Sequence, residues 1–585
     1  LSVVADALYS GPIGGGRIEK MSLKTPADVA WTENGWTVAS KECPRITAAS
    51  WVGAGLRTGA FAGAPCPVNG IIAASSDGKI TGRSDWAKLS IPARMGDKAD
   101  APRLLLTAAN ASIALHGESA SPHFLISIPN VSAQVTTRSE EDASDVVTGL
   151  TSQVFTIDMN PTDAGMAIDL LAQGGAVDLD DSTLEVVDAQ ATVKGVMATA
   201  GLNATISGVS ARVRDPGEAP LVTDLLLTGQ GASESGKIAI DMVAQPEIGG
   251  PSLANIRITH DLEDGKGRAV ATTDDMHFSL ARQPQDLFPS LKGLVADVRG
   301  GASGVVQARW GDAGFFTSGV FNLDKLDFST FSLGPVQGVS GKIKFDDLLK
   351  PSTPPGQHIE VALLNPGVAV ENMTMNFQLQ SLDTMRIEGG EAKVVGGRFL
   401  IEPVTWVFGP QRQQFALAVE DAPIQEILKL FNNPDLKGTG ILRGRIPMAM
   451  EDGHMFVENA HLEAVGAGAL QVDIPAAAQA SADNKFVELA FNALKDLQFT
   501  LLAVDVNGQV DGRLENKLTI RGRSPTASNL PFVYNIGLSA QILPLIQQAR
   551  YIYDKSAIGD YTRAQLANPA GDTPVTIDVA PAPKE

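Results

Sequence analysis

Apolar and polar side chains alternate at every second position in many segments of this 585-residue chain, and this pattern constrains the fold more than any other feature. The segment NMTMNFQLQ at 372–380 shows the pattern most clearly. Because successive side chains of a β-strand point to opposite faces, the pattern predicts strands with one buried face. The apolar positions are Met373, Met375, Phe377 and Leu379 in that segment, and Ile238, Ile240, Met242, Ile256, Ile258, Met276, Phe278, Leu280, Phe415, Leu417, Val419, Leu518 and Ile520 elsewhere.

Dipeptides that favour tight turns separate these alternating segments. An Asp or Asn followed by Gly tolerates the positive φ angles of a two-residue hairpin. Hairpins join antiparallel strands, and the long crossover helices that a parallel sheet requires are not evident, so the sequence predicts a mainly antiparallel β fold. The dipeptides are Asp77-Gly78, Asp264-Gly265, Asp452-Gly453, Asn507-Gly508 and Asp511-Gly512.

Helical periodicity is limited to two short amphipathic segments. A helix is predicted to begin after Asp421 as its cap, with Pro423 in the first turn, and to end before Pro434. A second is predicted from Pro544 to Tyr551. Such helices usually cover the end of a β-core.

Net charge and composition argue against nucleic-acid binding and against a spanning helix. The formal charge is −20, and no block of Lys or Arg could form a footprint on phosphates. No run reaches the 18 or so consecutive apolar residues of a transmembrane helix. The chain opens at Leu1 without a signal peptide, so we expect a processed product or a fragment whose membrane anchor lies elsewhere.

Two cysteines, Cys43 and Cys66, are too few for a four-cysteine zinc site. An intrachain disulfide is predicted, which requires an oxidising compartment. Two buried free thiols are the alternative.

No motif for catalysis, metal binding or a cofactor is present. Residues 231–238, GASESGKI, lack the Ser or Thr that ends a phosphate-binding P-loop, and continue as a strand. The seven histidines lack metalloprotease spacing, and a G-x-S-x-G nucleophile elbow does not occur. We therefore expect neither an enzyme, nor a metal site, nor a cofactor.

From about Phe321 onward, the sequence resembles the C-terminal region of YdbH-type proteins, which belong to the AsmA-like superfamily of inter-membrane lipid-transport proteins. The likeness combines a helix, a glycine-punctuated strand, a hairpin and a second glycine-punctuated strand. The segments that carry it are GGRFLIEPVTW (396–406), APIQEILKLF (422–431), LKGTGILRGRIPM (436–448), NAHLEAVGAGALQVD (459–473) and NLPFVYNIGLSAQILPLI (529–546).

The resemblance implies a long, twisted antiparallel sheet that curls into an open, taco-like groove with an apolar lining. Three regions are expected: 1–320, the N-terminal part of the groove; 321–550, the YdbH-like part; and 551–585, a partly disordered tail. The implied function is non-enzymatic transport of phospholipid, or of another acyl-chain lipid, across the periplasm between the inner and outer membranes. The chain would be anchored in the inner membrane through a segment outside this sequence, and a small outer-membrane lipoprotein is an expected partner.

The apolar face of each alternating strand is the expected groove lining. The alternation does not distinguish an open groove from an ordinary closed core, because it shows only that one face avoids water. A structural or adhesive β-solenoid at the cell surface is therefore the alternative function. The predicted lining residues are Ile238, Ile240, Met242, Met373, Met375, Phe377, Leu379, Phe415, Leu417, Val419, Leu518 and Ile520.

Overall fold

A computed structural model of the chain is composed almost entirely of antiparallel β-strands. The mainly β, mostly antiparallel fold with a few short helices is thereby confirmed. The described residues are 1–13, 16–53, 55–95, 102–138, 145–179, 184–198, 201–217, 220, 222–311, 314–330, 334–365, 368–409, 411–430, 435–451, 454–472, 485–510, 512–540 and 577–578. The predicted tail at 551–585 therefore lies outside them, apart from a two-residue strand, β38 (Ile577–Asp578).

The chain divides into two compact units. The first unit comprises Leu1–Met276, Arg282–Lys292 and Ser303–Val320, and the second comprises His277–Ala281, Gly293–Ala302 and Phe321–Glu585. Three strands, β21 (Gly267–Phe278), β22 (Ala296–Gly311) and β23 (Gly314–Thr330), contribute residues to both.

The first unit consists of strands β1 to β21 and a few 3₁₀ turns. The strands are β1 (Ser2–Ile13), β2 (Gly16–Thr32), β3 (Gly35–Ala39), β4 (Arg45–Ala48), β5 (Ser50–Gly53), β6 (Leu56–Thr58), β7 (Phe61–Gly63), β8 (Cys66–Pro67), β9 (Ile71–Ser76), β10 (Lys79–Met95), β11 (Arg103–Glu118), β12 (Ser121–Ser127), β13 (Val131–Arg138), β14 (Asp145–Thr162), β15 (Gly165–Leu179), β16 (Glu185–Ala198), β17 (Gly201–Arg214), β18 (Leu225–Glu234), β19 (Lys237–Pro246), β20 (Ala254–Asp261) and β21 (Gly267–Phe278). The 3₁₀ turns are η1 (Val68–Gly70), η2 (Pro284–Asp286) and η3 (Pro289–Leu291).

In its described part, the second unit contains the remaining strands, two short α-helices and one 3₁₀ turn. The elements are β24 (Gly334–Phe345), β25 (Gln357–Leu364), β26 (Val370–Ser381), β27 (Thr384–Val394), β28 (Gly397–Ile401), β29 (Val404–Val407), β30 (Gln413–Pro423), α1 (Ile424–Lys429), β31 (Leu436–Gly438), β32 (Ile441–Glu451), β33 (His454–Ala464), β34 (Gly468–Val472), α3 (Lys485–Leu494), β35 (Leu497–Gln509), β36 (Leu514–Arg523), η4 (Pro525–Ala527) and β37 (Pro531–Ala540).

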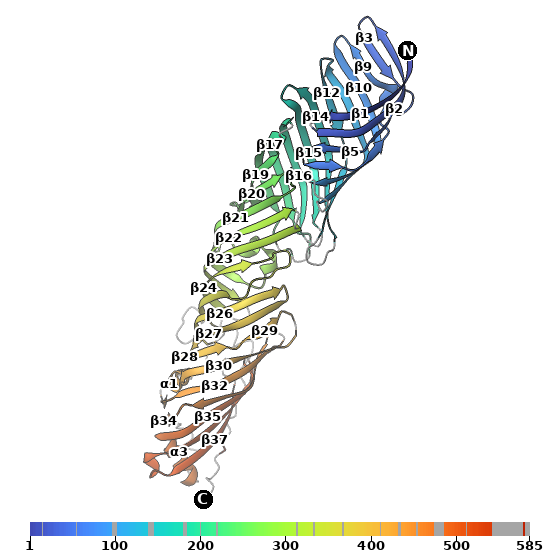
Figure 1. Cartoon of the computed structure of the whole chain (residues 1–585). Coiled ribbons are helices and arrows are strands. Elements are labelled where there is room, and N and C mark those ends of the chain that lie inside the picture. The colour runs from blue at the N-terminus through green and yellow to red at the C-terminus, as the bar shows by residue number, and fades with distance from the viewer. Residues whose placement is uncertain are drawn as a thin grey trace, which may run out of the picture. The chain divides into compact units, whose positions relative to one another are not determined.

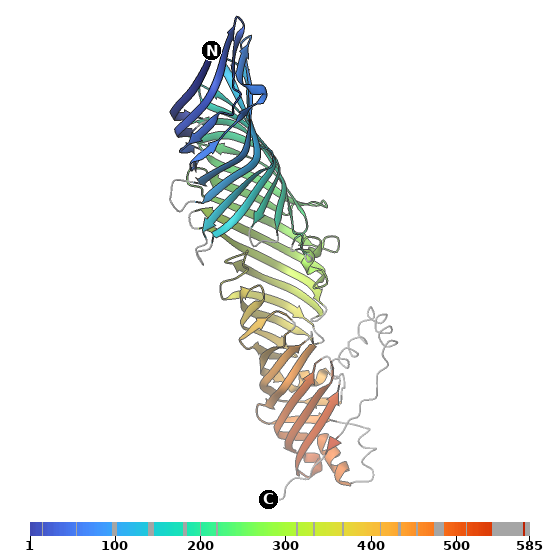
Figure 2. The ribbon, with the colours of Figure 1, turned by 90° about the vertical axis from the view of Figure 1, so that its right-hand side faces the viewer.

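In the first unit, each strand from β14 to β20 pairs with the next strand along the chain, always antiparallel. Figure 1 shows these strands side by side in chain order, and Figure 2 shows the twist of the same strands from a perpendicular direction. A right-handed twist is the usual consequence of backbone sterics in an open sheet.

The predicted turns at Asp77-Gly78 and Asp264-Gly265 are confirmed. Asp77 and Gly78 have φ angles of 50° and 76° and connect β9 to β10, as expected for a primed hairpin turn. Gly265 has a φ of 71° in the turn between β20 and β21. Asp452-Gly453 and Asp511 lie outside the described residues.

The prediction of a turn at Asn507-Gly508 was wrong, because both residues lie within β35. Gly508 has a φ of 122° and pairs with Leu514 of β36. A Cβ atom on Gly508 would lie 2.4 Å from the carbonyl oxygen of Arg513, so this glycine permits a close approach of two strands instead of a turn.

The helix predicted after Asp421 is present as α1, but its predicted cap was wrong. Pro423 is the N-cap residue and makes no side-chain cap hydrogen bond. Asp421 lies in β30 with a φ of 53°, and its Oδ1 accepts a hydrogen bond from Arg443 Nη2 at 2.6 Å. The helix predicted at 544–551 lies outside the described residues, while α3 was not predicted.

Candidate functional site

The strand register of the first unit aligns residues from ten strands into one row, in which nine strands contribute an apolar side chain and one contributes a glycine. Each member pairs directly with the next across the sheet, and no charged side chain interrupts the series. We call this series the apolar row. It runs through Ile113, Ile126, Ile157, Leu170, Val193, Ile206, Gly231, Ile240, Ile258 and Ala269.

The residues adjacent to the apolar row form a second row of different chemistry. They lie one position later in every second strand and one position earlier in the strands between, because neighbouring strands are antiparallel. Because side chains alternate, this second row lies on the opposite face of the sheet, which we call the polar face. It includes charged pairs such as Lys194 Nζ and Asp169 Oδ2, which are 2.7 Å apart. The row runs through Ala114, Leu125, Asp158, Asp169, Lys194, Thr205, Ala232, Ala239, Thr259 and Arg268.

The apolar face of the first unit remains partly open to solvent. Nine of the ten members of the apolar row are only partly buried, and Ile206 is the buried exception. Phe124 and Leu150, on the same face, are 37% and 36% exposed. Within the described part of this unit, helical geometry is limited to the three-residue turns η1, η2 and η3. Apolar side chains therefore line a face against which no α-helix of the described residues packs.

The second unit repeats this arrangement with its own apolar rows. One row runs from β24 to β32 and the other from β27 to β37. The first is Gly341, Ile359, Met375, Gly390, Ile401, Leu417 and Ile446. The second is Ala392, Phe399, Val419, Gly444, Leu462, Val504, Leu518 and Ile536.

All twelve residues predicted to line a groove lie on the apolar face of their unit, because strand alternation and register place them there. Their burial differs. Ile238, Ile240, Met373, Met375, Leu379, Phe415, Leu417 and Leu518 are partly buried, whereas Met242, Phe377, Val419 and Ile520 are 7%, 8%, 2% and 2% exposed.

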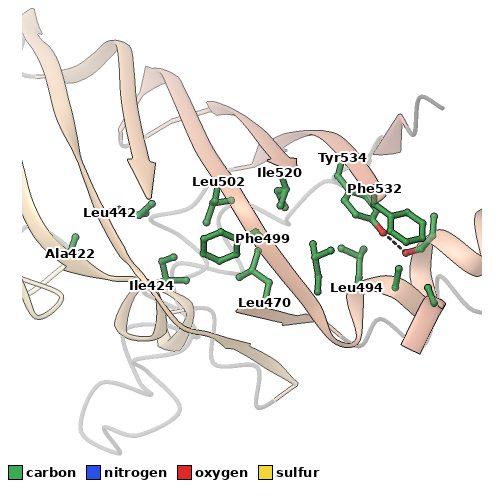
Figure 3. Packing of buried hydrophobic residues seen from close by; sticks show 14 of the residues in the cluster. Ala422, Ile424, Leu442, Leu470, Leu494, Phe499, Leu502, Ile520, Phe532 and Tyr534 are labelled. Atoms are coloured by element: carbon green, nitrogen blue, oxygen red, sulfur yellow. Dashed lines mark hydrogen bonds between the residues drawn. The ribbon is translucent and has the colours of Figure 1, made fainter. Parts of the chain in front are cut away.

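Val419 and Ile520 belong to a closed cluster, which we call the C-terminal core. Its side chains come from β30 to β37 and from both helices of the second unit. Figure 3 shows the labelled members pointing toward one another. The buried members are Val419, Ala422, Ile424, Leu442, Leu470, Ala490, Ala493, Leu494, Leu497, Phe499, Leu502, Ile520, Ala527, Phe532 and Tyr534.

Helix α3 covers the apolar face in the C-terminal core. Its residues Ala490, Ala493 and Leu494 are 2%, 0% and 6% exposed. The Tyr534 hydroxyl of β37 donates a hydrogen bond to the Ala490 carbonyl oxygen at 2.8 Å (Figure 3). Burial raises the pKa of Tyr534, because the charged phenolate would lose its hydration. This helix was not predicted, although the apolar residues of KFVELAFNAL recur at helical spacing.

The polar face of the second unit carries exposed ion pairs. Arg445 Nη2 lies 2.8 Å from Glu402 Oε2, and Arg398 Nη1 lies 2.9 Å from Glu420 Oε2. The hydrogen bonds from Arg445 lower the pKa of Glu402. Such exposed pairs contribute little to stability, and they indicate a face that contacts water.

A hollow of about 970 Å³ lies over β18 to β21 in the first unit. Most of its lining belongs to the polar face, including Gln230, Asp241, Arg257 and Arg268. Arg257 Nη1 and Asp241 Oδ1 are 3.3 Å apart, so charged groups line this hollow. Because Val243 and Val270 also line it, the hollow is of mixed polarity, whereas the row without charged side chains lies on the opposite face.

A disulfide joins Cys43 and Cys66, whose Cα atoms are 4.2 Å apart. Residues 231–238 form the hairpin between β18 and β19, so this segment does not have the strand-to-helix geometry of a P-loop. Neither helix in the described part of the chain is long and apolar enough to span a bilayer.

One family model matches the chain, and it covers residues 134–556. Its description is YdbH-like, intermembrane phospholipid transport protein YdbH. The match begins well before Phe321, where the resemblance noted from individual segments starts. No curated protein and no solved structure matches the chain. Because the family match covers well over half of the sequence, the chain belongs to the YdbH-like family of intermembrane phospholipid transport proteins.

Proposed function

We propose that the apolar face binds the acyl chains of phospholipids and shields them from water while the lipids cross between the inner and outer membranes. The observation that carries this proposal is the apolar row of the first unit, which is continuous over ten strands and of which nine members are only partly buried. At roughly 4.8 Å between neighbouring strands, this row extends about 43 Å.

The energetics of hydrocarbon in water support an apolar track of this kind. Each methylene exposed to water costs about 0.8 kcal/mol, so a lipid with about thirty methylenes faces a barrier on the order of 20 kcal/mol when it crosses water unshielded. Contact with one apolar wall removes a large part of that exposure. The zwitterionic or anionic headgroup keeps its hydration by remaining at the open side.

The proposal also specifies the cellular location of the chain, its membrane anchor and a partner. The chain works in the periplasm as a non-enzymatic conduit, anchored to the inner membrane by a segment outside this sequence. A small outer-membrane lipoprotein receives or stabilises its far end. The Cys43–Cys66 disulfide supports an oxidising compartment of this kind.

The rival function is a structural or adhesive β-solenoid with a filled interior. The C-terminal core favours it locally, because side chains fill that region without leaving room for lipid. The exposure of Phe124 and Leu150 in the first unit argues against it, because a filled interior would bury both.

Lipid analysis of matched variants tests the proposal. Ile240→Asp places a charge in the apolar row, whereas Thr259→Asp places the same charge on the exposed polar face of the neighbouring strand. Extracts of the purified protein are analysed by mass spectrometry. We expect phospholipid to co-purify with the parent and with T259D, and to fall at least about fivefold in I240D, because a carboxylate in contact with hydrocarbon is strongly unfavourable. A parent protein free of lipid contradicts the proposal.

Photocrosslinking locates the lipid on one face. A benzophenone amino acid at Leu170 lies in the apolar row, and the same residue at the adjacent Asp169 lies on the polar face. Lipid adducts are expected at position 170 and not at position 169. Equal yields at the two positions would show that the adducts arise from random encounter.

A further inference from the structure

Three side chains with metal-binding atoms converge on the polar face of the first unit. They are His116 of β11, His123 of β12 and Asp158 of β14, and their ligand atoms all lie within 4.8 Å of one another. Asp158 Oδ1 is 3.6 Å from His116 Nε2 and 3.4 Å from His123 Nδ1. We call this group the His–His–Asp triad. It lies on the side of the sheet opposite the apolar row.

The strand register places these three residues together. His116 pairs directly with His123, so the two side chains lie beside each other on the same face. Asp158 pairs with Leu125, two residues beyond His123, and is therefore a diagonal neighbour of His123 on that face. Three hydrogen-bonded strands thus hold the ligands, and no loop has to reorganise to assemble them.

One carboxylate oxygen of Asp158 lacks a hydrogen-bond donor among the described residues. Its Oδ1 atom is buried, although the side chain as a whole is 36% exposed, and it accepts no hydrogen bond. Two imidazole rings face it, with their centroids 5.1 Å apart. A buried carboxylate oxygen without a donor is costly, and a cation between the three groups removes that cost.

We propose that the His–His–Asp triad binds one divalent transition-metal ion of the Zn²⁺ type. Zinc bonds to imidazole nitrogen and carboxylate oxygen are about 2.0–2.2 Å long, so neighbouring ligands of a tetrahedral site are about 3.4 Å apart. The two distances from Asp158 Oδ1 match this spacing. Two imidazoles select zinc-like ions over Mg²⁺ and Ca²⁺, which take oxygen ligands. The ion joins β11, β12 and β14, and its remaining coordination position opens to solvent.

The charged residues next to the His–His–Asp triad are consistent with one bound cation. Asp169 pairs with Asp158 across β14 and β15, but its Oδ2 is 2.7 Å from Lys194 Nζ. Asp169 is therefore engaged by a lysine, and the triad supplies three protein ligands. Three protein ligands with one solvent position is a common arrangement for zinc.

Metal titration of the full chain tests the site. The protein is prepared without a histidine tag, because a tag would itself bind metal. Zn²⁺ binding is measured by isothermal titration calorimetry, and Co²⁺ serves as a spectroscopic probe of coordination. We expect one Zn²⁺ per chain, a dissociation constant in the micromolar range or below, and a visible Co²⁺ absorption band. The variants H116A, H123A and D158N are expected to bind at least about tenfold more weakly. Zn²⁺ is also expected to raise the melting temperature of the parent and not of the variants.

A matched histidine variant separates the triad from general surface binding. His358 is an exposed strand histidine with Asn376 Oδ1 at 2.8 Å and Glu360 Oε1 at 3.6 Å, so H358A removes a comparable imidazole. H358A should bind Zn²⁺ like the parent. D158N keeps the shape of the side chain, and circular dichroism verifies its fold before titration. The proposal is overturned by a parent that does not bind Zn²⁺, or by triad variants that bind as tightly as H358A.

Discussion

The apolar face over β11 to β21 and the apolar face over β30 to β37 have the same alternating pattern but different surroundings. Among the described residues of the first unit no α-helix packs against the face, and Phe124 is 37% exposed. In the second unit α1 and α3 lie against the face, and Phe499 is 1% exposed. Strand alternation therefore determines which side of a sheet is apolar, while the elements placed over that side determine whether it can accept a ligand.

The difference limits the proposed lipid path. Hydrocarbon can contact the partly buried apolar row of the first unit without any rearrangement. In the C-terminal core the same type of face is already occupied by Ala490, Ala493 and Leu494. Acyl chains can reach that part of the face only if α3 moves away.

The largest expected effect comes from truncating one phenylalanine in each region. Phe499→Ala leaves a cavity in the C-terminal core, where the side chain is almost fully buried, and should cost about 3–5 kcal/mol of unfolding free energy. Phe124→Ala removes a side chain that is partly in water and should cost about 1 kcal/mol. Denaturant unfolding measures both values. Equal costs would mean that the face around Phe124 is covered as completely as the C-terminal core.

The next effect concerns the disulfide of the first unit. Cys43 and Cys66 are 23 residues apart in the sequence, so replacing both by Ser should cost about 3 kcal/mol by releasing a closed loop in the unfolded chain. Hydrogen exchange followed by mass spectrometry should show lost protection in strands β3 to β10 and none in β30 to β37. Loss in the second unit as well would show that the two regions unfold together.

A smaller effect is expected from Tyr534 in the C-terminal core. Tyr534→Phe removes the hydrogen bond to Ala490 and should cost about 1 kcal/mol. Burial raises the pKa of this phenol above that of the unfolded chain, so its contribution is present below pH ~10 and declines as the pH rises further. Unfolding measured from pH 8 to pH 11 should show a decline in the parent that is reduced in Y534F. Identical pH profiles would mean that the phenol is accessible to water.

The smallest effect concerns His260, on the apolar face of the first unit. Burial lowers the pKa of this imidazole, and its Nδ1 accepts a hydrogen bond from Trp310 Nε1 at 3.2 Å. The neutral ring is favoured in the folded state, so its contribution is present above pH ~6.5 and is lost as the pH falls below that value. Because the ring is only partly buried, the loss should stay below about 1 kcal/mol. Melting temperatures of the parent and of His260→Phe between pH 7.5 and pH 5 measure this loss of stability. If the melting temperature of the variant falls with pH as much as that of the parent, protonation of His260 is not the cause.

Strand alternation predicted which side chains share the apolar face, because successive side chains of a strand point to opposite faces of the sheet. Ile240, Met375 and Leu518 each lie in an apolar row for this reason. Glycine roles were harder to predict, because Gly78 closes a hairpin while Gly508 lies opposite another strand. An Asp-Gly or Asn-Gly dipeptide can occupy either a hairpin turn or a strand. The position of the neighbouring strand decides which of the two forms.

The His–His–Asp triad and the C-terminal core were not accessible from the sequence. His116 and Asp158 come from different strands, and only the pairing of β11, β12 and β14 brings them together. Similarly, the Tyr534 hydroxyl contacts the Ala490 carbonyl of α3, and sequence periodicity does not specify that this helix lies against β37.

The sequence by itself determined an antiparallel β chain with one apolar and one polar face, because those properties arise from local alternation and turn chemistry. The tertiary structure alone decided where the apolar face remains partly open and where a helix covers it. The physical reason is that covering a face depends on contacts between segments far apart in the chain, and those contacts leave no periodic trace in the strands themselves.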